Sequence, residues 1–409
     1  MSIVTWLDFS EAQQRKVLEA LKGFEDKETV DDLGFGSIRD AISGTFFPGT
    51  SVLQTRARYL LFIPWIFQRA QSRWPANVVG KAADMERKLI LALLESEDHE
   101  GVIGRTRGKD LKTLPSAIYW SGLQTFGIFR RRGTSINQYG RAVSKPTKHI
   151  EYEGELGDDF ESFWSEMPPA PDNFFDFEFA ELALTKDEAR WLAERILDAE
   201  NISGRPNLFR DCLKKVRARD VDFLNAANVW EADISEEVDE QLHELINHAK
   251  HFSLMAHGAS LLYNVLLVEA LEKKGKEVNF PQNYSELLRQ WSMDAEKEGL
   301  SAWCSEIQDF WNCLEELGSS IPKATKDFVH DLAGKIGKLG LYKFALDEDV
   351  RTSIRKREIQ HKGHQARLRN ENRLVAFKGD AGLRPMNFRW TLVCRILRDI
   401  SDGFVEDAR

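Results

Sequence analysis

The sequence has few of the residues that build disulfide frameworks and structural zinc sites. Only four of its 409 residues are cysteines, and no two of them have Cys-x-x-Cys spacing: Cys212, Cys304, Cys313 and Cys394. This dispersal argues against both kinds of site and favours a reducing compartment. The N-terminus has no basic segment followed by an apolar one, and we see no window with the about 20 apolar residues that a membrane span needs. We therefore expect a cytoplasmic protein with no membrane partner.

The sequence also lacks a complete catalytic or cofactor motif. The loop at residues 104–110, GRTRGKD, resembles a phosphate-binding loop, but its glycines are one residue too close and Asp110 stands where a magnesium-binding Ser or Thr is needed. Asp84, Glu86 and Lys88 have the lettering of a nuclease, but they fall on a helical pattern instead of on adjacent strands. We predict no cofactor and no metal.

Large side chains and charges are plentiful, and the charges are unevenly distributed. The chain is 42% hydrophobic, with 11 Trp and 25 Phe, and its length suggests two or three packed units. Its formal net charge is −9, yet residues 103–148 carry ten bases and one acid, and residues 351–398 carry thirteen bases and three acids. Residues 151–200 carry sixteen acids and three bases. This pattern is typical of a protein with polyanion-binding faces, or of one whose own parts attract each other.

Residues 34–68 are the most informative stretch, and we predict two helices there joined by a turn at Pro48-Gly49. Ser51 and Gln54 have the spacing of a capping box, so we expect the second helix to begin at Ser51. Every residue from 59 to 67 is apolar, which indicates a buried helix that Pro64 kinks without ending.

Two arginines, Arg56 and Arg58, lead into this buried segment. We interpret them as structural, pairing with carboxylates or carbonyls at the rim of the core. The alternative is a site for phosphate or another anion.

The helical periodicities along the rest of the chain predict a mainly α-helical protein in three parts. Residues 1–145 form an N-terminal helical domain, with a winged-helix-like unit near residues 85–145. Residues 146–184 form an acidic connector rich in proline and phenylalanine. Residues 185–409 form a C-terminal helical bundle around the apolar segment 252–271, starting with a helix that Thr185 caps through Glu188.

A helix, a turn, a second helix starting at Pro115 and a basic hairpin follow one another in the order of a winged helix-turn-helix. That order predicts a nucleic-acid-binding face, with the Arg367 region as a second candidate face. The candidate contacts are Arg105, Arg107, Lys109, Tyr119, Arg130, Arg131, Arg132, Arg367, Arg369 and Arg373. The plainer interpretation is that Trp120, Leu123 and Phe126 are ordinary core and that the arginines form a solvated turn.

Several strings resemble a family of uncharacterised bacterial proteins that is classed as a domain of unknown function. They are LGFGSIRD at 33–40, FPGTS at 47–51, QTRARY at 54–59, LPSAIYW at 114–120, QARL at 365–368 and FRW at 388–390. The resemblance implies genes that travel with mobile and anti-phage defence clusters, beside helicases and phospholipase-D-like nucleases. It implies no activity and no catalytic residues.

Two further groups of residues have a chemical interpretation beside a plainer one. His243, His248, His251 and His257 fall within fifteen residues, which suits either a metal site or the polar edge of a helix. Arg355 followed by His361 resembles the site of helical metal-independent ribonucleases, with His as general base or acid and Arg as the stabiliser of developing charge. Lys356 departs from the polar residue usual in that site, and a plain basic helix is the alternative.

Taken together, these features favour a non-catalytic nucleic-acid-binding or adaptor subunit of a bacterial anti-phage defence system. We expect duplex DNA and other defence proteins, such as a helicase or a nuclease, as its partners. The alternatives are a metal-independent RNase or other nuclease that acts as the effector, and a purely protein-binding scaffold.

Overall fold

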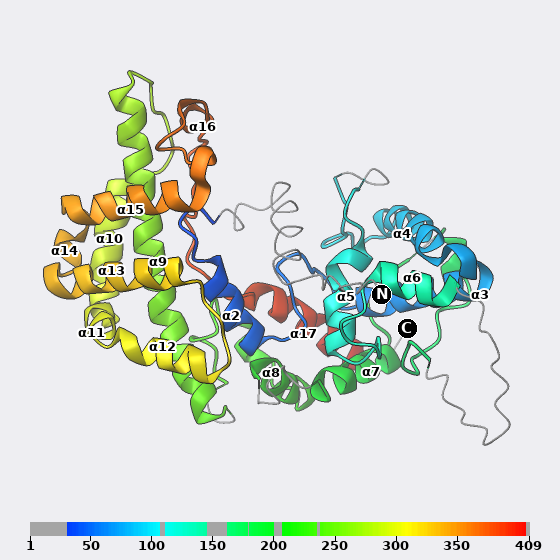
Figure 1. The fold of residues 1–409 in the computed structure, drawn as a ribbon. Helices are drawn as coiled ribbons and strands as arrows, with labels where there is room; N and C mark the ends of the chain where they lie inside the picture. Colours follow the sequence, from blue (N-terminus) through cyan, green and yellow to red (C-terminus); the bar gives the residue numbers. More distant parts are fainter. Residues whose placement is uncertain are drawn as a thin grey trace, which may run out of the picture. The chain divides into compact units, whose positions relative to one another are not determined.

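The computed structural model describes residues 31–106, 111–144, 162–178, 180–199, 207–234 and 238–405. These residues form 16 α-helices and no strand, so the prediction of a mainly α-helical protein is confirmed (Figure 1). A winged helix also needs a two-stranded wing. The described part of the predicted wing contains only an isolated bridge between Phe129 and Trp164, so a winged-helix unit is not seen there.

The helices divide into two compact units, and neither is one continuous stretch of chain. The α3 unit comprises the described residues of Ser43–His243 and Arg389–Arg409, and the α9 unit comprises those of Met1–Ile42 and Glu244–Phe388. This division differs from the predicted boundaries near residues 145 and 185. The physical reason is that the last helix packs on helices from the middle of the chain, which no local pattern reveals.

The α3 unit is built around a helix that is buried along most of its length. Its helices are α3 (Tyr59–Arg73), α4 (Val78–Leu94), α5 (Pro115–Thr125), α6 (Ile136–Ser144), α7 (Lys186–Leu197), α8 (Leu208–Arg217) and α17 (Trp390–Val405). Short 3₁₀ turns cover Pro75–Asn77, Phe174–Asp176 and Asp222–Asn225. Helix α17 packs on α7 and α8, while α4 and α5 pack on α3.

The prediction that the apolar residues 59–67 form a buried helix is confirmed. All nine residues from 59 to 67 are buried, and Pro64 lies inside α3 without ending it. Part of the predicted connector also packs here: the Phe174 ring stacks on Phe62 at 5.5 Å, and Trp65 Nε1 donates to the carbonyl of Pro168 at 2.8 Å. Phe179 of the same aromatic cluster lies outside the described residues.

The start of α3 differs from the prediction. The helix begins at Tyr59, and the expected capping box is absent because Gln54 Nε2 donates to the carbonyl of Gly49 at 3.0 Å instead. The backbone amides before the helix find tertiary partners. Tyr119 Oη accepts from the amides of Thr55 and Arg56, and Asp399 accepts from that of Ala57, so an extended segment satisfies its donors without a helix.

The predicted Pro48-Gly49 turn brings its backbone against α5. Gly49 has a φ of +78°, which favours glycine, and a β-carbon added at Gly122 would lie only 2.6 Å from the Gly49 carbonyl oxygen. Both glycines are therefore required where the turn and the helix approach each other closely.

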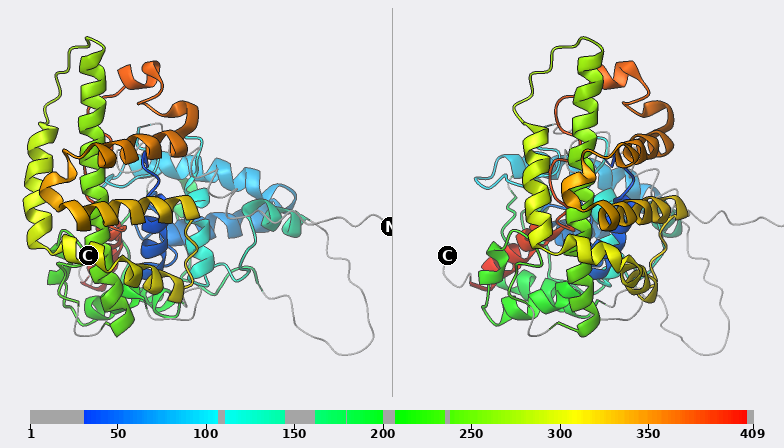
Figure 2. Two further views of the ribbon diagram at one scale, coloured as in Figure 1. Left: turned by 60° about the vertical axis from the view of Figure 1, so that its left-hand side comes forward. Right: turned by 90° about the vertical axis from the view of Figure 1, so that its left-hand side faces the viewer.

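The α9 unit is a helical bundle around α9 (Glu240–Lys273), which begins just before the unit's boundary. Its other helices are α10 (Tyr284–Lys297), α11 (Leu300–Ser305), α12 (Ile307–Glu316), α13 (Lys323–Leu339), α14 (Leu341–Phe344), α15 (Glu348–Lys362) and α16 (Glu371–Val375). Figures 1 and 2 show α13 and α15 side by side, both crossing α9. Helix α2 (Gly36–Phe46) contains the boundary between the two units.

The 34-residue helix α9 corrects one expectation from the sequence. By length and composition it contains a window apolar enough to cross a membrane, which the sequence analysis did not find. Of that window, 61% is buried within the protein. A buried core helix meets the same criteria, because both environments select apolar residues on all sides.

Helix α4 places a carboxylate at the buried N-terminus of α5. Glu86 is 1% exposed, and its two oxygens accept from the amide and the hydroxyl of Ser116 at 2.7 and 2.8 Å. These bonds satisfy donors in the first turn of α5. Burial raises the Glu86 pKa from its ordinary 4.5 to about 7, against the lowering effect of the two hydrogen bonds.

Glu86 should therefore make stability depend on pH. The folded state holds the proton more tightly than the unfolded chain, so the contribution is complete below about pH 4.5 and is lost as pH rises through about 7. We expect the free energy of unfolding of Glu86→Gln, relative to that of wild type, to increase by on the order of 2 kcal/mol between pH 5 and pH 7.5. Urea unfolding at the two pH values measures this difference. The exposed Glu95→Gln should follow wild type. Parallel pH profiles for Glu86→Gln and wild type would contradict this assignment.

Candidate functional site

Three consecutive arginines, Arg130, Arg131 and Arg132, occupy a turn whose backbone is held on both sides. The Phe129 amide donates to the Leu123 carbonyl at 2.9 Å, and the Arg130 amide donates to the Phe163 carbonyl at 2.9 Å. Farther along the chain, Trp120 Nε1 donates to the carbonyl of Thr134 at 2.7 Å. The turn is therefore anchored before and after its arginines by helix α5 and by the segment around Phe163.

A cluster of aromatic side chains packs against the turn. Its members come from α3, α5, α6, the start of the turn itself and the segment after residue 161: Phe67, Trp120, Phe129, Tyr139, Phe163 and Trp164. Ring centroids lie as close as 4.8 Å for Trp120 and Phe129, and 5.0 Å for Phe129 and Trp164. Burial raises the pKa of Tyr139 to about 12, so its hydroxyl stays protonated and donates to Gln71 Oε1 at 2.6 Å. Such a cluster makes the turn rigid.

The side chains of the three arginines are exposed, and within the described part of the chain none of them has an ion-pair partner. The Arg131 guanidinium carbon lies 4.3 Å from the centroid of the Phe163 ring, a cation–π contact that leaves its N–H donors available. This turn is consequently a fixed, positively charged edge of the α3 unit.

The other candidate nucleic-acid contacts within residues 103–148 lie in different environments. Tyr119 is fully buried, and its hydroxyl donates to the Arg56 carbonyl at 2.8 Å besides accepting the two amides named above. Burial raises its pKa to about 12. Tyr119 therefore supports the core and is not presented to a groove. Arg105 is exposed, and Arg107 and Lys109 lie outside the described residues.

The second candidate face, in the α9 unit, is only partly a surface. Arg367 pairs with Asp32 at 2.7 Å and donates to Tyr263 Oη at 3.3 Å, so it holds residues before α2 in place. Arg369 and Arg373 are exposed, and only Arg373 lies on a helix, α16. These three arginines thus do not form one continuous basic helix.

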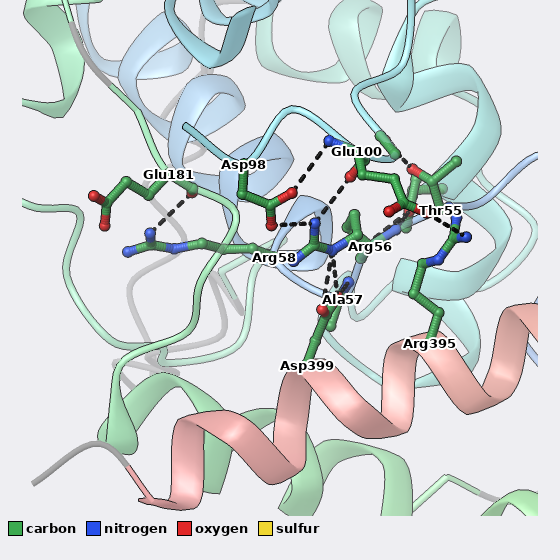
Figure 3. A network of polar contacts seen from close by, with 11 residues as sticks. Thr55, Arg56, Ala57, Arg58, Asp98, Glu100, Glu181, Arg395 and Asp399 are labelled. Carbon is green, nitrogen blue, oxygen red and sulfur yellow. Dashed lines mark hydrogen bonds and ion pairs between the residues drawn. The ribbon is translucent and has the colours of Figure 1, made fainter. Parts of the chain in front are cut away.

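Arg56 lies at the centre of a polar network in the α3 unit (Figure 3). Its Nε donates to Asp399 of α17 at 2.9 Å, and its Nη1 donates to Asp98 at 2.6 Å and to the carbonyl of Glu100 at 2.9 Å. Burial raises the Asp399 pKa, although Arg56 and the Ala57 amide both lower it. Arg395, one turn before Asp399 on α17, pairs with Glu100 at 3.0 Å. The network fastens the C-terminal helix to the segment before α3.

Arg58 makes a second, more deeply buried contact. Its Nη2 lies 2.9 Å from Glu188 Oε1, with the two side chains 8% and 4% exposed, and its Nη1 donates to the carbonyl of Glu181 at 3.0 Å. Glu188 also closes the predicted capping box with Thr185 at the start of α7. Arg56 and Arg58 thus both donate to carboxylates and carbonyls of the same unit.

Removing Arg58 should destabilise the protein strongly. Arg58→Ala leaves Glu188 buried without its cation, a change that costs about 3–5 kcal/mol for buried pairs. Combining Arg58→Met with Glu188→Gln removes both charges and should recover most of that loss, because an uncharged pair of similar volume needs no compensation. Urea unfolding midpoints measure both effects. An Arg58→Ala protein that unfolds like wild type would show that this pair is not structural.

Three of the four clustered histidines, His248, His251 and His257, form hydrogen bonds within the α9 unit, whereas His243 is exposed. His248 Nδ1 accepts from Trp303 Nε1 at 2.9 Å, and the nitrogens of His251 lie 2.9 Å from the carbonyls of Asn247 and Glu298. His257 Nε2 lies 3.0 Å from the carbonyl of Leu383. Within the described residues, no three His, Cys, Asp or Glu side chains are grouped to hold a metal ion.

Arg355 and His361, the pair that resembles a ribonuclease site, lie on different faces of α15. Six residues correspond to about 600° of helical rotation, which leaves Arg355 and His361 about 120° apart on the helix surface. Arg355 pairs with Glu348 at 2.6 Å, and His361 Nε2 lies 3.9 Å from Asp31 Oδ2. Burial lowers the His361 pKa. The two side chains are directed to different carboxylates, so this chain does not bring them to a common phosphate.

The structure reveals one feature that sequence reasoning missed, a groove of about 550 Å³ beside the arginine turn. It is lined by Arg130, Ser165, Glu166, Met167, Pro168, Asp187, Arg190, Trp191, Glu194 and Arg195. The only sequence signal for it is the spacing of Asp187, Trp191 and Glu194, which predicts one helix face but not what that face opposes.

The chain matches a family of unknown function (DUF6361) over residues 1–404, and it belongs to that family. No curated protein and no solved structure matches it.

Proposed function

We propose that this member of the DUF6361 family is a non-catalytic nucleic-acid-binding protein, and that Arg130, Arg131 and Arg132 contact the phosphates. One observation carries the proposal: three exposed guanidinium groups without ion-pair partners among the described residues stand on an immobilised turn. Guanidinium groups suit phosphate because their fork of N–H donors matches phosphate oxygens.

Rigidity supports the same proposal. A ligand that meets a flexible loop must order it, whereas a turn anchored through Phe129 and Trp120 loses little conformational freedom on binding. Phosphate contacts position a protein on nucleic acid without reading its sequence. The proposed partner is therefore duplex DNA bound without sequence preference.

The surrounding charge favours an anionic partner. Residues 103–148 carry ten bases and one acid in a chain of net charge −9. A local positive field attracts polyanions although the whole protein is acidic. A cytoplasmic location and an adaptor role among anti-phage defence proteins rest on the resemblance and on the free, buried cysteines, and they belong to the same proposal.

The salt dependence of binding tests this proposal. Each phosphate contact releases counterions, and each lost contact lowers the log–log slope of affinity against salt by about 0.9. Replacing Arg130, Arg131 and Arg132 by Gln should therefore flatten the slope by about 2 to 3 for a duplex of about 30 base pairs between about 50 and 200 mM salt.

A matched control separates this effect from a general change in charge. Replacing the exposed Arg210, Arg217 and Arg219 by Gln removes the same charge from the same unit and should leave the slope near that of wild type. The nucleic acid should stay intact with and without magnesium or manganese. If wild type fails to bind at the lowest salt, or the first triple variant keeps its slope, the turn instead serves the acidic segment 151–200 or a partner protein.

A further inference from the structure

We propose that the groove beside the arginine turn holds one unpaired base of a single-stranded nucleic acid. This inference rests on the proposed function, and it adds single strands to the duplex DNA proposed there as a ligand. The base would stack on Trp191 while Arg130 contacts the neighbouring phosphate. The proposal follows from the size of the groove, from the side chains that line it and from two polar atoms in it without partners.

The groove is open to solvent, and its volume is that of a small-ligand site. Its volume of about 550 Å³ falls within the range of about 300–1,000 Å³ common for such pockets. One wall is helix α7 from Asp187 to Arg195, and the other is the segment at residues 165–168. Arg130 belongs both to this groove and to the turn, so a strand following the turn's arginines reaches the groove directly.

Trp191 is held where a base could stack on it. Its Nε1 donates to the carbonyl of Glu166 at 3.0 Å, which fixes the indole relative to the opposite wall. Met167 and Pro168 add apolar surface to the groove. Bases of every kind stack on an aromatic side chain because each has a π-face, and this is the usual anchor of single-stranded nucleic acids.

Two carboxylates supply hydrogen-bond acceptors next to Trp191. Asp187 and Glu194 are seven residues apart on α7, and Trp191 is four residues from one and three from the other, so all three share a helix face. A carboxylate accepts but does not donate, and it therefore suits the exocyclic amino group of cytosine. Thymine has no such group. Arg190 Nη1 lies 4.0 Å from Asp187 Oδ1, which is too far for a hydrogen bond, so the Asp187 oxygens can still accept from a ligand.

Two side chains that line the groove each have a polar atom that is buried behind the groove surface and has no hydrogen-bond partner among the described residues, namely Ser165 Oγ and Arg195 Nε. Ser165 is only 9% exposed, and a buried hydroxyl without a partner costs free energy that a ligand can recover. A phosphate or sugar oxygen beside Arg130 would satisfy such donors. These atoms are the second indication, independent of shape, that something polar binds here.

Fluorescence anisotropy with three labelled probes tests the assignment: a 12-nucleotide oligo-dC, the same length of oligo-dT, and a blunt 30-base-pair duplex. Trp191→Ala should weaken oligo-dC binding by about 10-fold, equivalent to about 1.4 kcal/mol, and change duplex binding by less than about 2-fold. Trp191→Phe should keep most of the affinity, because it retains an aromatic ring. Trp74→Ala removes an exposed tryptophan of the same unit, 40% exposed, and should behave like wild type.

The role of the Asp187 and Glu194 carboxylates is tested by the preference for oligo-dC over oligo-dT. Wild type should prefer oligo-dC over oligo-dT by about five-fold, and Asp187→Asn combined with Glu194→Gln should abolish that preference. The ratio of the two affinities is the measured quantity, since removing negative charge strengthens binding to every strand. Unfolding midpoints confirm that each variant is folded.

The outcomes distinguish this inference from the proposed function. Arginine-dependent duplex binding without oligo-dC binding, or an equal loss for both probes in Trp191→Ala, overturns the groove alone. Oligo-dC binding that needs Trp191 but keeps its salt slope in the triple arginine variant overturns the phosphate role of the turn, including that of Arg130 beside the groove, and supports only the stacking of a base on Trp191. Absence of binding to all three probes overturns both.

Discussion

The α3 unit depends on satisfying three backbone amides that lie outside any helix. Thr55, Arg56 and Ala57 precede α3 in an extended segment, and in a largely buried position each amide needs an acceptor. The hydroxyl of Tyr119 and the carboxylate of Asp399 provide them. Because Tyr119 belongs to α5 and Asp399 to α17, this requirement ties three distant parts of the chain to the start of the central helix.

The ion pairs of Arg56 and Arg58 extend the same connection. Arg56 adds Asp98 and the Glu100 carbonyl to the contact with α17, and Arg58 joins the segment before α3 to α7 through Glu188. Buried charges of this kind are weak evidence for stability by themselves, since their desolvation offsets much of their attraction. Their value here is specificity, because each charge has one geometry in which its donors are satisfied.

The arginine turn shows the opposite use of the same side chain. Arg56 and both terminal nitrogens of Arg58 donate to carboxylates and carbonyls, whereas Arg130, Arg131 and Arg132 keep their donors available on a turn that the aromatic cluster holds in place. The sequence favoured a structural role for the first set and left an anion site open as the alternative. What separates them is whether carboxylates from distant segments come within reach, and this decides which arginines can serve a ligand.

Several elements could be predicted from the sequence because their signals are local. The apolar run in α3, the proline at the start of α5 and the capping box of Thr185 and Glu188 each act within a few residues. The capping box expected at Ser51 failed for the converse reason. Its Gln54 found the Gly49 carbonyl, and distant partners satisfied the amides that follow, so a tertiary contact replaced a local one.

By itself, the sequence determined the helical class, most helices and the position of the basic blocks, since periodicity and charge are properties of neighbouring residues. Only the tertiary structure decided the division into units, the burial of Tyr119, the position of His361 next to Asp31 and the groove at Trp191. Each of these depends on which segments far apart in the chain come together. That choice is made by packing of apolar faces and satisfaction of buried polar groups, which no local pattern specifies.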